Sequence, residues 1–131
     1  MLFEDAATWT RFVEANGPSL ERVWYDVHVG KAVVPLEGSP GFLQAVADGV
    51  TRKRIDVVAQ QAGRLLIIEV KPFCSMIALG QAVVYQRLFE QEYGRRIFTI
   101  GCIVCDQVDE DVGPIADELG IKVLSTGFAV L

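Results

Sequence analysis

The sequence predicts an α/β fold in which helices and strands follow one another along a single domain. Two segments place apolar residues at helical spacing, and several short runs of β-branched or aliphatic residues are bounded by turn residues, as in strands. Hydrophobic residues make up 51% of the 131-residue chain, which is enough for one sizeable core. We therefore expect one domain over residues 1–131, with the element order α β β β α β α β.

The first predicted helix lies at the N-terminus. Leu2, Ala6, Trp9 and Val13 recur at steps of four, three and four residues, so they share one face of a helix. The pair Gly17–Pro18 ends the helical pattern.

A strand is predicted over residues 22–34, because apolar and more polar residues alternate from Val23 to Val29. We expect a kink or a turn in it at Gly30. The stretch from Pro35 to about Gly49 contains proline and glycine and is predicted to be the longest loop.

A β-hairpin is predicted next. Its strands are residues 54–59 (RIDVVA) and 64–71 (RLLIIEVK), which are rich in β-branched and aliphatic residues and are joined by a short polar connection with Gly63.

A longer helix is predicted over residues 75–93, through the helical spacing of Ile77, Val84 and Leu88, and Gly94 ends it. The acidic run from Asp106 to Asp111 is expected to be a solvated loop and helix start. The remaining predicted elements are a buried strand over residues 97–105, a short helix over 110–119 and a strand over 121–124.

The second hairpin strand contains an anomaly. Residues 65–70 are almost wholly apolar, as in a strand covered on both faces, yet they include Glu69 and are followed by Lys71. A buried charge is unfavourable unless it is paired. Because side chains alternate along a strand, Glu69 and Lys71 point to the same face.

The hairpin brings a second carboxylate to this place. If it closes with the four-residue loop Gln61–Arg64, then Gln60 pairs with Leu65 and Asp56 falls opposite Glu69. Like charges on directly opposed residues, whose Cβ atoms lie about 4.5–5.5 Å apart, destabilise a sheet. A hard divalent cation such as Mg²⁺ or Mn²⁺ would compensate, because such ions prefer oxygen ligands.

The alternative interpretation needs no metal. In it, Asp56 is solvated at a strand end, and Glu69 forms an ordinary ion pair with Lys71, Lys53 or Arg54.

These residues resemble the central motif of the PD-(D/E)xK nuclease superfamily, which includes restriction endonucleases, Holliday-junction resolvases and RecB- or Cas4-like nucleases. Ile55-Asp56 followed by Glu69-Val70-Lys71 matches the motif, with Ile55 in the place of its proline. On the following helix, Gln81 and Tyr85 look like the QxxxY motif of a subset of these nucleases. The resemblance implies a restriction endonuclease-like αβββαβ core, with a mixed central sheet flanked by helices.

The resemblance also implies metal-dependent hydrolysis of phosphodiester bonds, most simply in DNA. Asp56, Glu69 and the Val70 carbonyl would hold Mg²⁺ or Mn²⁺, and Lys71 would position water or stabilise negative charge. Gln81 and Tyr85 would contact the metal shell or a phosphate.

In this superfamily an acidic residue of the first helix often completes the metal site. The candidates are Glu4, Glu14 and Glu21, of which we favour Glu14 because it adjoins the apolar stripe at Val13.

The net charge of −5 runs against the basic footprint of most nucleic-acid-binding proteins. Basic residues nevertheless cluster at Arg52, Lys53 and Arg54 and again at Arg95 and Arg96, and the first cluster is expected to position a DNA strand. RNA is a possible substrate as well. A homodimer is the preferred assembly, because two sites would allow both strands of a duplex to be cut.

The three cysteines, Cys74, Cys102 and Cys105, form no disulfide or zinc pattern, and positions 102 and 105 face opposite sides of a strand. Free, buried thiols are therefore expected. We also expect a cytoplasmic protein, because no apolar run is long enough for a membrane helix and the start lacks signal-peptide features.

Two other functions stay open. One is a non-catalytic nucleic-acid-binding or assembly subunit that retains the nuclease fold. The other is an ordinary ligand-binding domain in which Glu69 and Lys71 form a structural ion pair, and this reading predicts no binding of divalent metal.

Overall fold

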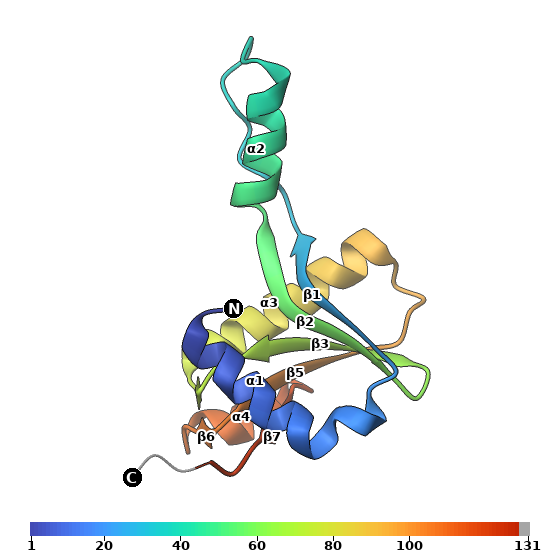
Figure 1. Cartoon of the computed structure of the whole chain (residues 1–131), viewed down its shortest axis with the longest axis vertical. Helices are drawn as coiled ribbons and strands as arrows, with labels where there is room; N and C mark the ends of the chain where they lie inside the picture. The colour runs from blue at the N-terminus through green and yellow to red at the C-terminus, as the bar shows by residue number, and fades with distance from the viewer. Residues whose placement is uncertain (129–131) are drawn as a thin grey trace.

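A five-stranded mixed sheet forms the centre of the structure (Figure 1). The structure is a computed structural model that describes residues 1–128, and the side chains of residues 44 and 47–50 lie outside the description. The helices are α1 (Phe3–Asn16), the 3₁₀ turn η1 (Gly17–Ser19), α2 (Gly41–Thr51), α3 (Met76–Tyr93) and α4 (Val112–Glu118). The strands are β1 (Arg22–Val29), β2 (Lys53–Gln61), β3 (Arg64–Val70), β4 (Phe73–Cys74), β5 (Thr99–Cys105), β6 (Gln107–Val108) and β7 (Lys122–Ser125).

The strand order in the sheet is β1-β2-β3-β5-β7. The first three strands are antiparallel neighbours, whereas β5 runs parallel to β3 and β7 runs parallel to β5. The α/β fold with a mixed central sheet is therefore confirmed. The short strands β4 and β6, which the sequence did not predict, form a separate parallel pair.

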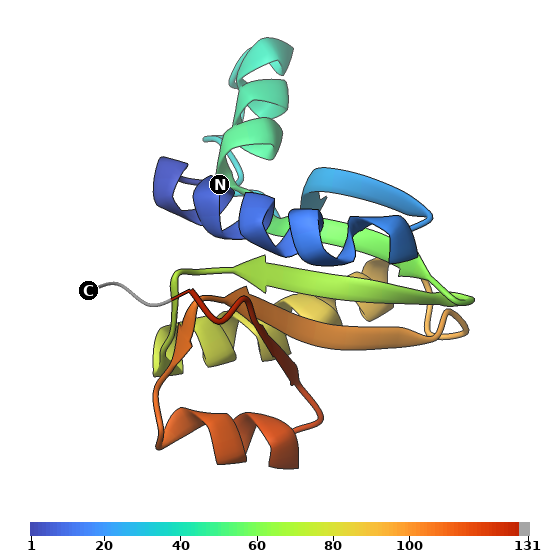
Figure 2. The ribbon, with the colours of Figure 1, turned by 60° about the horizontal axis from the view of Figure 1, so that its bottom comes forward.

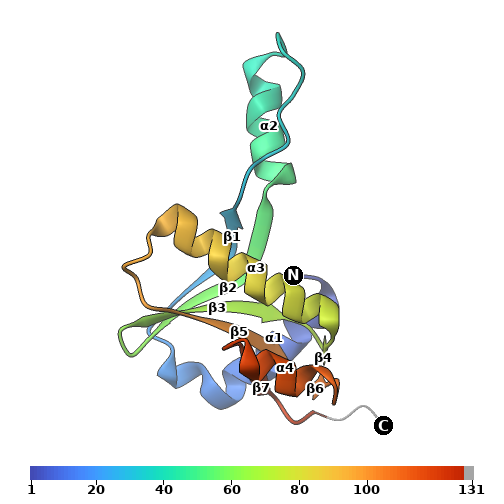
Figure 3. The ribbon, with the colours of Figure 1, turned by 180° about the vertical axis from the view of Figure 1, so that it is seen from behind.

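Helices cover both faces of this sheet (Figure 2). On one face α1 packs Trp9 and Phe12 against apolar side chains of β2, β3 and β5. On the other face α3 crosses the sheet, with α4 beside it (Figure 3). The apolar strand β3 is thus buried from both sides, as its composition predicted.

The β2–β3 hairpin has the predicted register, with Gln60 opposite Leu65, although its loop is shorter. Gln61 also pairs with Arg64, which leaves only Ala62 and Gly63 at the tip. Both have positive φ, of 50° and 77°, as type I′ hairpin turns require.

Strands β1 and β2 are irregular at Asp26 and Asp56. The register is the same on both sides, with Tyr25 opposite Val57 and Val27 opposite Ile55, but the intervening residues Asp26 and Asp56 do not pair, and Asp26 has a φ of 51°. Ile55 and Val58 pack into the same cluster below α3 although they are three residues apart, which a regular strand does not allow. The strands therefore change the face they present at this point, and Asp56 lies at the change.

The region between β1 and β2 differs from the prediction. Strand β1 ends at Val29, Gly30 has a φ of 78°, and the expected loop contains the helix α2. Residues 30–52 project beyond the sheet as an arm (Figure 1). The prolines and glycines at positions 35–41 suggested a loop throughout, but they are confined to the ascending half of the arm and the first residue of α2.

The predicted helix over residues 75–93 is confirmed, but its buried face is not the one that the spacing suggested. Ile77 and Val84 are exposed, whereas Ala82 and Phe89 are buried. Small residues bring this helix close to the sheet, which the spacing of large apolar residues did not indicate.

The three cysteines are free and buried, as expected. Cys102 packs on the α1 side of the sheet and Cys105 on the α3 side, so they cannot act as a pair. In the part of the chain that the structure describes, we find no helix long and apolar enough to cross a membrane.

Candidate metal and active site

Glu69 and Lys71 lie at the carboxyl end of β3, which is the central strand of the sheet. The Lys71 N–H donates to the Val104 carbonyl at 3.0 Å, so the backbone is held beside β5 up to this residue. Glu69 is only 4% exposed. The Lys71 Nζ lies 3.8 Å from Glu69 Oε1, so the contact that the alternative interpretation expects is present.

Asp56 joins this strand end from β2. Its Oδ2 accepts a hydrogen bond of 2.9 Å from the Val70 N–H, and the irregularity of β2 at this residue coincides with that contact. Burial raises the pKa of Asp56, and the Val70 hydrogen bond and the charge of Lys71 oppose the rise. The Asp56 carboxylate is therefore fixed by the backbone of β3 and lies within the field of the Lys71 ammonium.

Glu69 and Asp56 are close enough to affect each other's ionisation. Burial raises the pKa of Glu69 to about 8, the charge of Asp56 raises it further, and Lys71 only partly opposes both. Near neutral pH Glu69 therefore holds a proton, and a bound cation would take the place of that proton.

A third acidic residue reaches the site from the first turn of α1. Asp5 is 3% exposed, its Oδ2 lies 3.3 Å from Lys71 Nζ, and the same oxygen accepts the Leu2 N–H at 3.2 Å. Burial lowers the pKa of Lys71, but the charges of Asp5 and Glu69 outweigh burial and leave it raised. Lys71 is therefore a charged lysine between two carboxylates.

This geometry corrects the expectation for the first helix. Glu14 is exposed and lies nine residues, or about 13.5 Å of helix rise, beyond Asp5. Glu4 is exposed, and Glu21 accepts a hydrogen bond from Ala62 at the opposite end of the hairpin. Asp5 was overlooked because an acid in a first turn has an ordinary role at the helix N-terminus; its burial was not visible in the sequence.

Tyr85 of α3 lies near the same carboxylates, and Gln81, one turn earlier on the helix, is hydrogen-bonded to it. Burial raises the pKa of Tyr85, and so do the charges of Glu69 and Asp56, which places its hydroxyl within their field. Both residues are half-buried. The structure thus brings together the residues that the sequence singled out on β2, β3 and α3.

Two buried oxygen atoms at this site lack a hydrogen-bond partner among the described residues. They are Glu69 Oε2 and Gln81 Oε1. A buried acceptor without a partner is unfavourable, and oxygen acceptors are what Mg²⁺ and Mn²⁺ bind.

The residues present therefore fit a divalent ion held by Asp56, Glu69 and a neighbouring backbone oxygen. Within residues 1–128, no three acidic, histidine or cysteine side chains form a ready-made metal cluster. Asp5, which is engaged with Lys71, stands outside the immediate pair.

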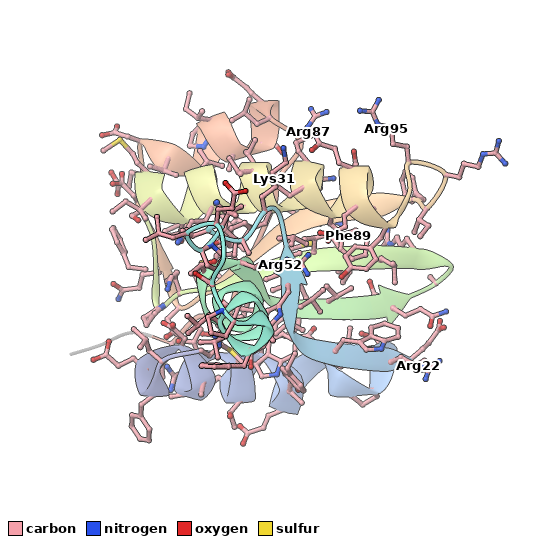
Figure 4. All side chains as sticks on the ribbon, turned by 90° about the horizontal axis from the view of Figure 1, so that it is seen from above. Arg22, Lys31, Arg52, Arg87, Phe89 and Arg95 are labelled. Atoms are coloured by element: carbon pink, nitrogen blue, oxygen red, sulfur yellow. The ribbon has the colours of Figure 1, made fainter. Side chains whose placement is uncertain are left out.

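The predicted basic cluster is divided. Arg52 bonds to Glu92 and to the carbonyls of His28 and Gly30 at the base of the arm, while Lys53 and Arg54 are exposed on β2. Arg52 thus holds the base of the arm, and its expected contact with DNA stays a prediction. Figure 4 shows Arg87 and Arg95 projecting outward on the α3 side of the molecule and Arg22 on the opposite side, so these labelled cations form no common patch.

The fold can be compared with those of known proteins. No protein-family model and no curated protein matches the sequence significantly. Among solved structures, a protein of unknown function, AF1548, is 17% identical with a TM-score of 0.61, over 96% of this chain and 59% of that chain. A repair endonuclease from Pyrococcus abyssi is 16% identical with a TM-score of 0.55, over 92% of this chain and 46% of that chain.

EndoMS in complex with double-stranded DNA is also 16% identical, with a TM-score of 0.54, over 98% of this chain and 48% of that chain. The chain thus spans about half the length of these proteins. At this level of identity the likeness is one of fold, and the chain has an endonuclease-type α/β fold.

Proposed function

We propose that this chain is a nuclease that hydrolyses phosphodiester bonds of DNA with Mg²⁺ or Mn²⁺. The observation that carries the proposal is the convergence of Asp56, Glu69 and Lys71 at the end of β3, with Glu69 Oε2 buried and unpaired. The endonuclease folds of two structural neighbours, one of them in complex with DNA, support it.

The metal would be held by Asp56, Glu69 and the Val70 carbonyl. The Val70 N–H already orients Asp56, so the backbone of one residue would fix a carboxylate ligand and supply a further oxygen. Such an ion, when bound, polarises a phosphoryl oxygen and makes a bound water more acidic.

Lys71 would act on the reacting phosphate. It is 30% exposed on its side chain, so its ammonium reaches solvent while Asp5 and Glu69 hold it in place. A fixed ammonium in such a position stabilises the negative charge that develops during hydrolysis. Asp5 would thus position Lys71 from α1.

Gln81 and Tyr85 would border the substrate on the α3 side. The raised pKa of Tyr85 keeps its hydroxyl protonated, so that it is a hydrogen-bond donor to a phosphate oxygen. The buried Gln81 Oε1 would accept a hydrogen bond from a water molecule beside the substrate.

The proposal is tested by cleavage of labelled single-stranded, duplex and branched DNA, and of RNA, with Mg²⁺ or Mn²⁺. We expect metal-dependent cleavage that EDTA abolishes, that Glu69→Ala eliminates, and that Lys71→Ala reduces by at least about 100-fold. Lys122→Ala, which alters an exposed lysine on β7, is the matched control and should retain activity.

Each outcome identifies a different function. Cleavage that survives Lys71→Ala in a folded variant would exclude the role proposed for Lys71. If no substrate is cut but DNA binds, the chain is a non-catalytic nucleic-acid-binding subunit. If neither DNA nor divalent metal binds, Glu69 and Lys71 form a structural ion pair only.

A further inference from the structure

The arm of residues 30–52 is held firmly at its base. Arg52 pairs with Glu92 of α3, and the same carboxylate accepts the Gly30 N–H at 3.2 Å. The Tyr93 hydroxyl donates to the His28 carbonyl at 3.1 Å. The arm therefore leaves the domain in a defined direction (Figure 4).

Beyond this base, α2 stands away from the sheet in every view (Figures 1, 2 and 3). It has 11 residues, whereas isolated helices shorter than about 12–15 residues are marginal in water. Helices of this length usually depend on packing for their stability. The helix therefore needs a surface that covers it.

The arm exposes many large apolar side chains. Phe42 is 68% exposed and Leu36 is 87% exposed. Together the exposed side chains offer on the order of 500 Å² of apolar surface, which lies in the upper part of the range for the largest patch on a monomer and approaches the roughly 800 Å² that each partner buries in a stable interface. They are Val33, Val34, Leu36, Phe42, Leu43 and Val46.

The chemistry of α2 excludes two kinds of partner. Its sequence, GFLQAVADGVT, contains no lysine or arginine. Nucleic acids and anionic membranes are bound through such cations. The surface of α2 therefore fits an uncharged, apolar protein surface better than a nucleic acid or an anionic membrane.

The helix itself carries such a surface with a complementary shape. Gly41 and Ala45 lie four residues apart in one row, while Phe42 and Val46 form the adjacent row, which is exposed. Rows at this spacing are the ridges and grooves through which helices pack. A row without large side chains beside a row of large ones fits a second copy of the same helix.

We propose that two copies of this chain form a two-fold symmetric dimer through their α2 arms, with the Phe42 and Val46 ridge of each copy in the Gly41–Ala45 groove of the other. A two-fold axis uses the same patch on both partners, as this surface requires. If the proposed nuclease function holds, the dimer presents two sites to one duplex.

Analytical ultracentrifugation of the full chain across concentrations tests this assembly. The wild type should show a monomer–dimer equilibrium, and Phe42→Glu combined with Val46→Glu should make it monomeric. Leu119→Glu introduces the same charge at an exposed apolar residue after α4 and should leave the dimer intact.

Ala45→Leu separates loss of dimerisation from loss of folding. It keeps the helix apolar and lowers helix propensity only slightly, because leucine ranks close to alanine, but it fills the proposed groove. We expect the dimer dissociation constant to rise at least about tenfold, with circular dichroism unchanged.

A wild-type chain that stays monomeric near 1 mM would overturn the proposal. So would a dimer that persists in the Phe42→Glu, Val46→Glu variant. Neither result depends on whether the chain cleaves DNA.

Discussion

At the scale of residues, the site is a balance between acids and one lysine. Asp56 and Glu69 repel each other in a partly buried place, and Lys71 is shared between Glu69 and Asp5. One positive charge does not neutralise three carboxylates. The proton retained by Glu69 near neutral pH removes part of the excess negative charge, and a divalent ion would neutralise more of it.

The assignment of Asp5 rather than Glu14 can be tested by a matched pair of variants. Asp5→Asn removes the charge beside Lys71, whereas Glu14→Gln removes a charge on an exposed part of the same helix. We expect Asp5→Asn to reduce cleavage at least about tenfold and to lower the pKa of Lys71, because a carboxylate that raises it is lost. Glu14→Gln should have wild-type activity, and the reverse ranking would restore Glu14 to the site.

The raised pKa of Glu69 predicts an unusual dependence of stability on pH. Below pH 4.5 the carboxyl is protonated in both the folded and the unfolded chain. Between that pH and about 8, only the folded chain keeps the proton, so the free energy of unfolding falls as pH rises. At about 1.4 kcal/mol for each unit of raised pKa, the loss amounts to a few kcal/mol.

Urea unfolding in EDTA near pH 5 and pH 9 measures this loss. Glu69→Gln carries no ionisable group at this position, so it should lose less stability than the wild type over the same range. Equal losses in the two proteins would show that Glu69 is ionised in the folded chain without metal.

At the scale of elements, α1 is fixed to the sheet by Asp106 at the end of β5. Arg11 of α1 donates to both carboxylate oxygens at 3.0 and 2.7 Å, and Thr8 donates at 2.8 Å. Thr126, after β7, adds another hydrogen bond. This network places the helix that carries Asp5. The expectation that Asp106 lies in a solvated loop is wrong, since it is 5% exposed.

Replacing Asp106 should therefore loosen α1. The hydrogen bonds from Arg11, Thr126 and Thr8 lower the pKa of Asp106 to about 2, so its contribution to stability is present above pH 3.8 and is lost as pH falls towards 2. We expect Asp106→Asn to reduce the free energy of unfolding by about 2–4 kcal/mol at neutral pH.

Urea unfolding at several pH values checks this expectation, with the exposed Asp117→Asn as the control. The difference between Asp106→Asn and the wild type should shrink below pH 4. A difference that stays constant with pH would mean that the Asp106 charge does not hold α1.

The elements that sequence predicted best are those whose pattern depends on local chemistry. The hairpin register follows from Gly63 and the apolar strands, and it correctly brought Asp56 to Glu69. Helix α2 was missed because Pro35, Gly38 and Pro40 dominate its approach, although Phe42, Leu43 and Val46 already had helical spacing.

Tertiary contacts explain the other differences. Asp5 is part of the site only because Asp106 and Arg11 hold α1 over the end of β3, and no local pattern encodes a contact 95 residues apart. The buried face of α3 is set by how closely Ala78 and Ala82 approach the sheet. Such contacts depend on the assembled core rather than on the residues of one element.

At the scale of the whole molecule, an endonuclease-type fold carries the acidic pair Asp56 and Glu69 with Lys71 at the carboxyl end of its central strand. The net charge of −5 runs against the basic footprint by which most proteins bind DNA. Metal at the site and a second copy on the arm are two ways in which such a domain would gain affinity for a duplex. Both follow from groups that the single chain leaves unsatisfied, Glu69 Oε2 and the exposed side chains of α2.

Calorimetric titration with Mn²⁺ near pH 7, in buffers of different ionisation enthalpy, tests the metal site most directly. We predict one bound ion per chain with release of a proton from Glu69, and loss of binding in Glu69→Gln and Asp56→Asn but not in Glu14→Gln. Absence of binding by the wild type, or equal binding by Glu69→Gln, would contradict the assignment of Asp56 and Glu69 as a metal site.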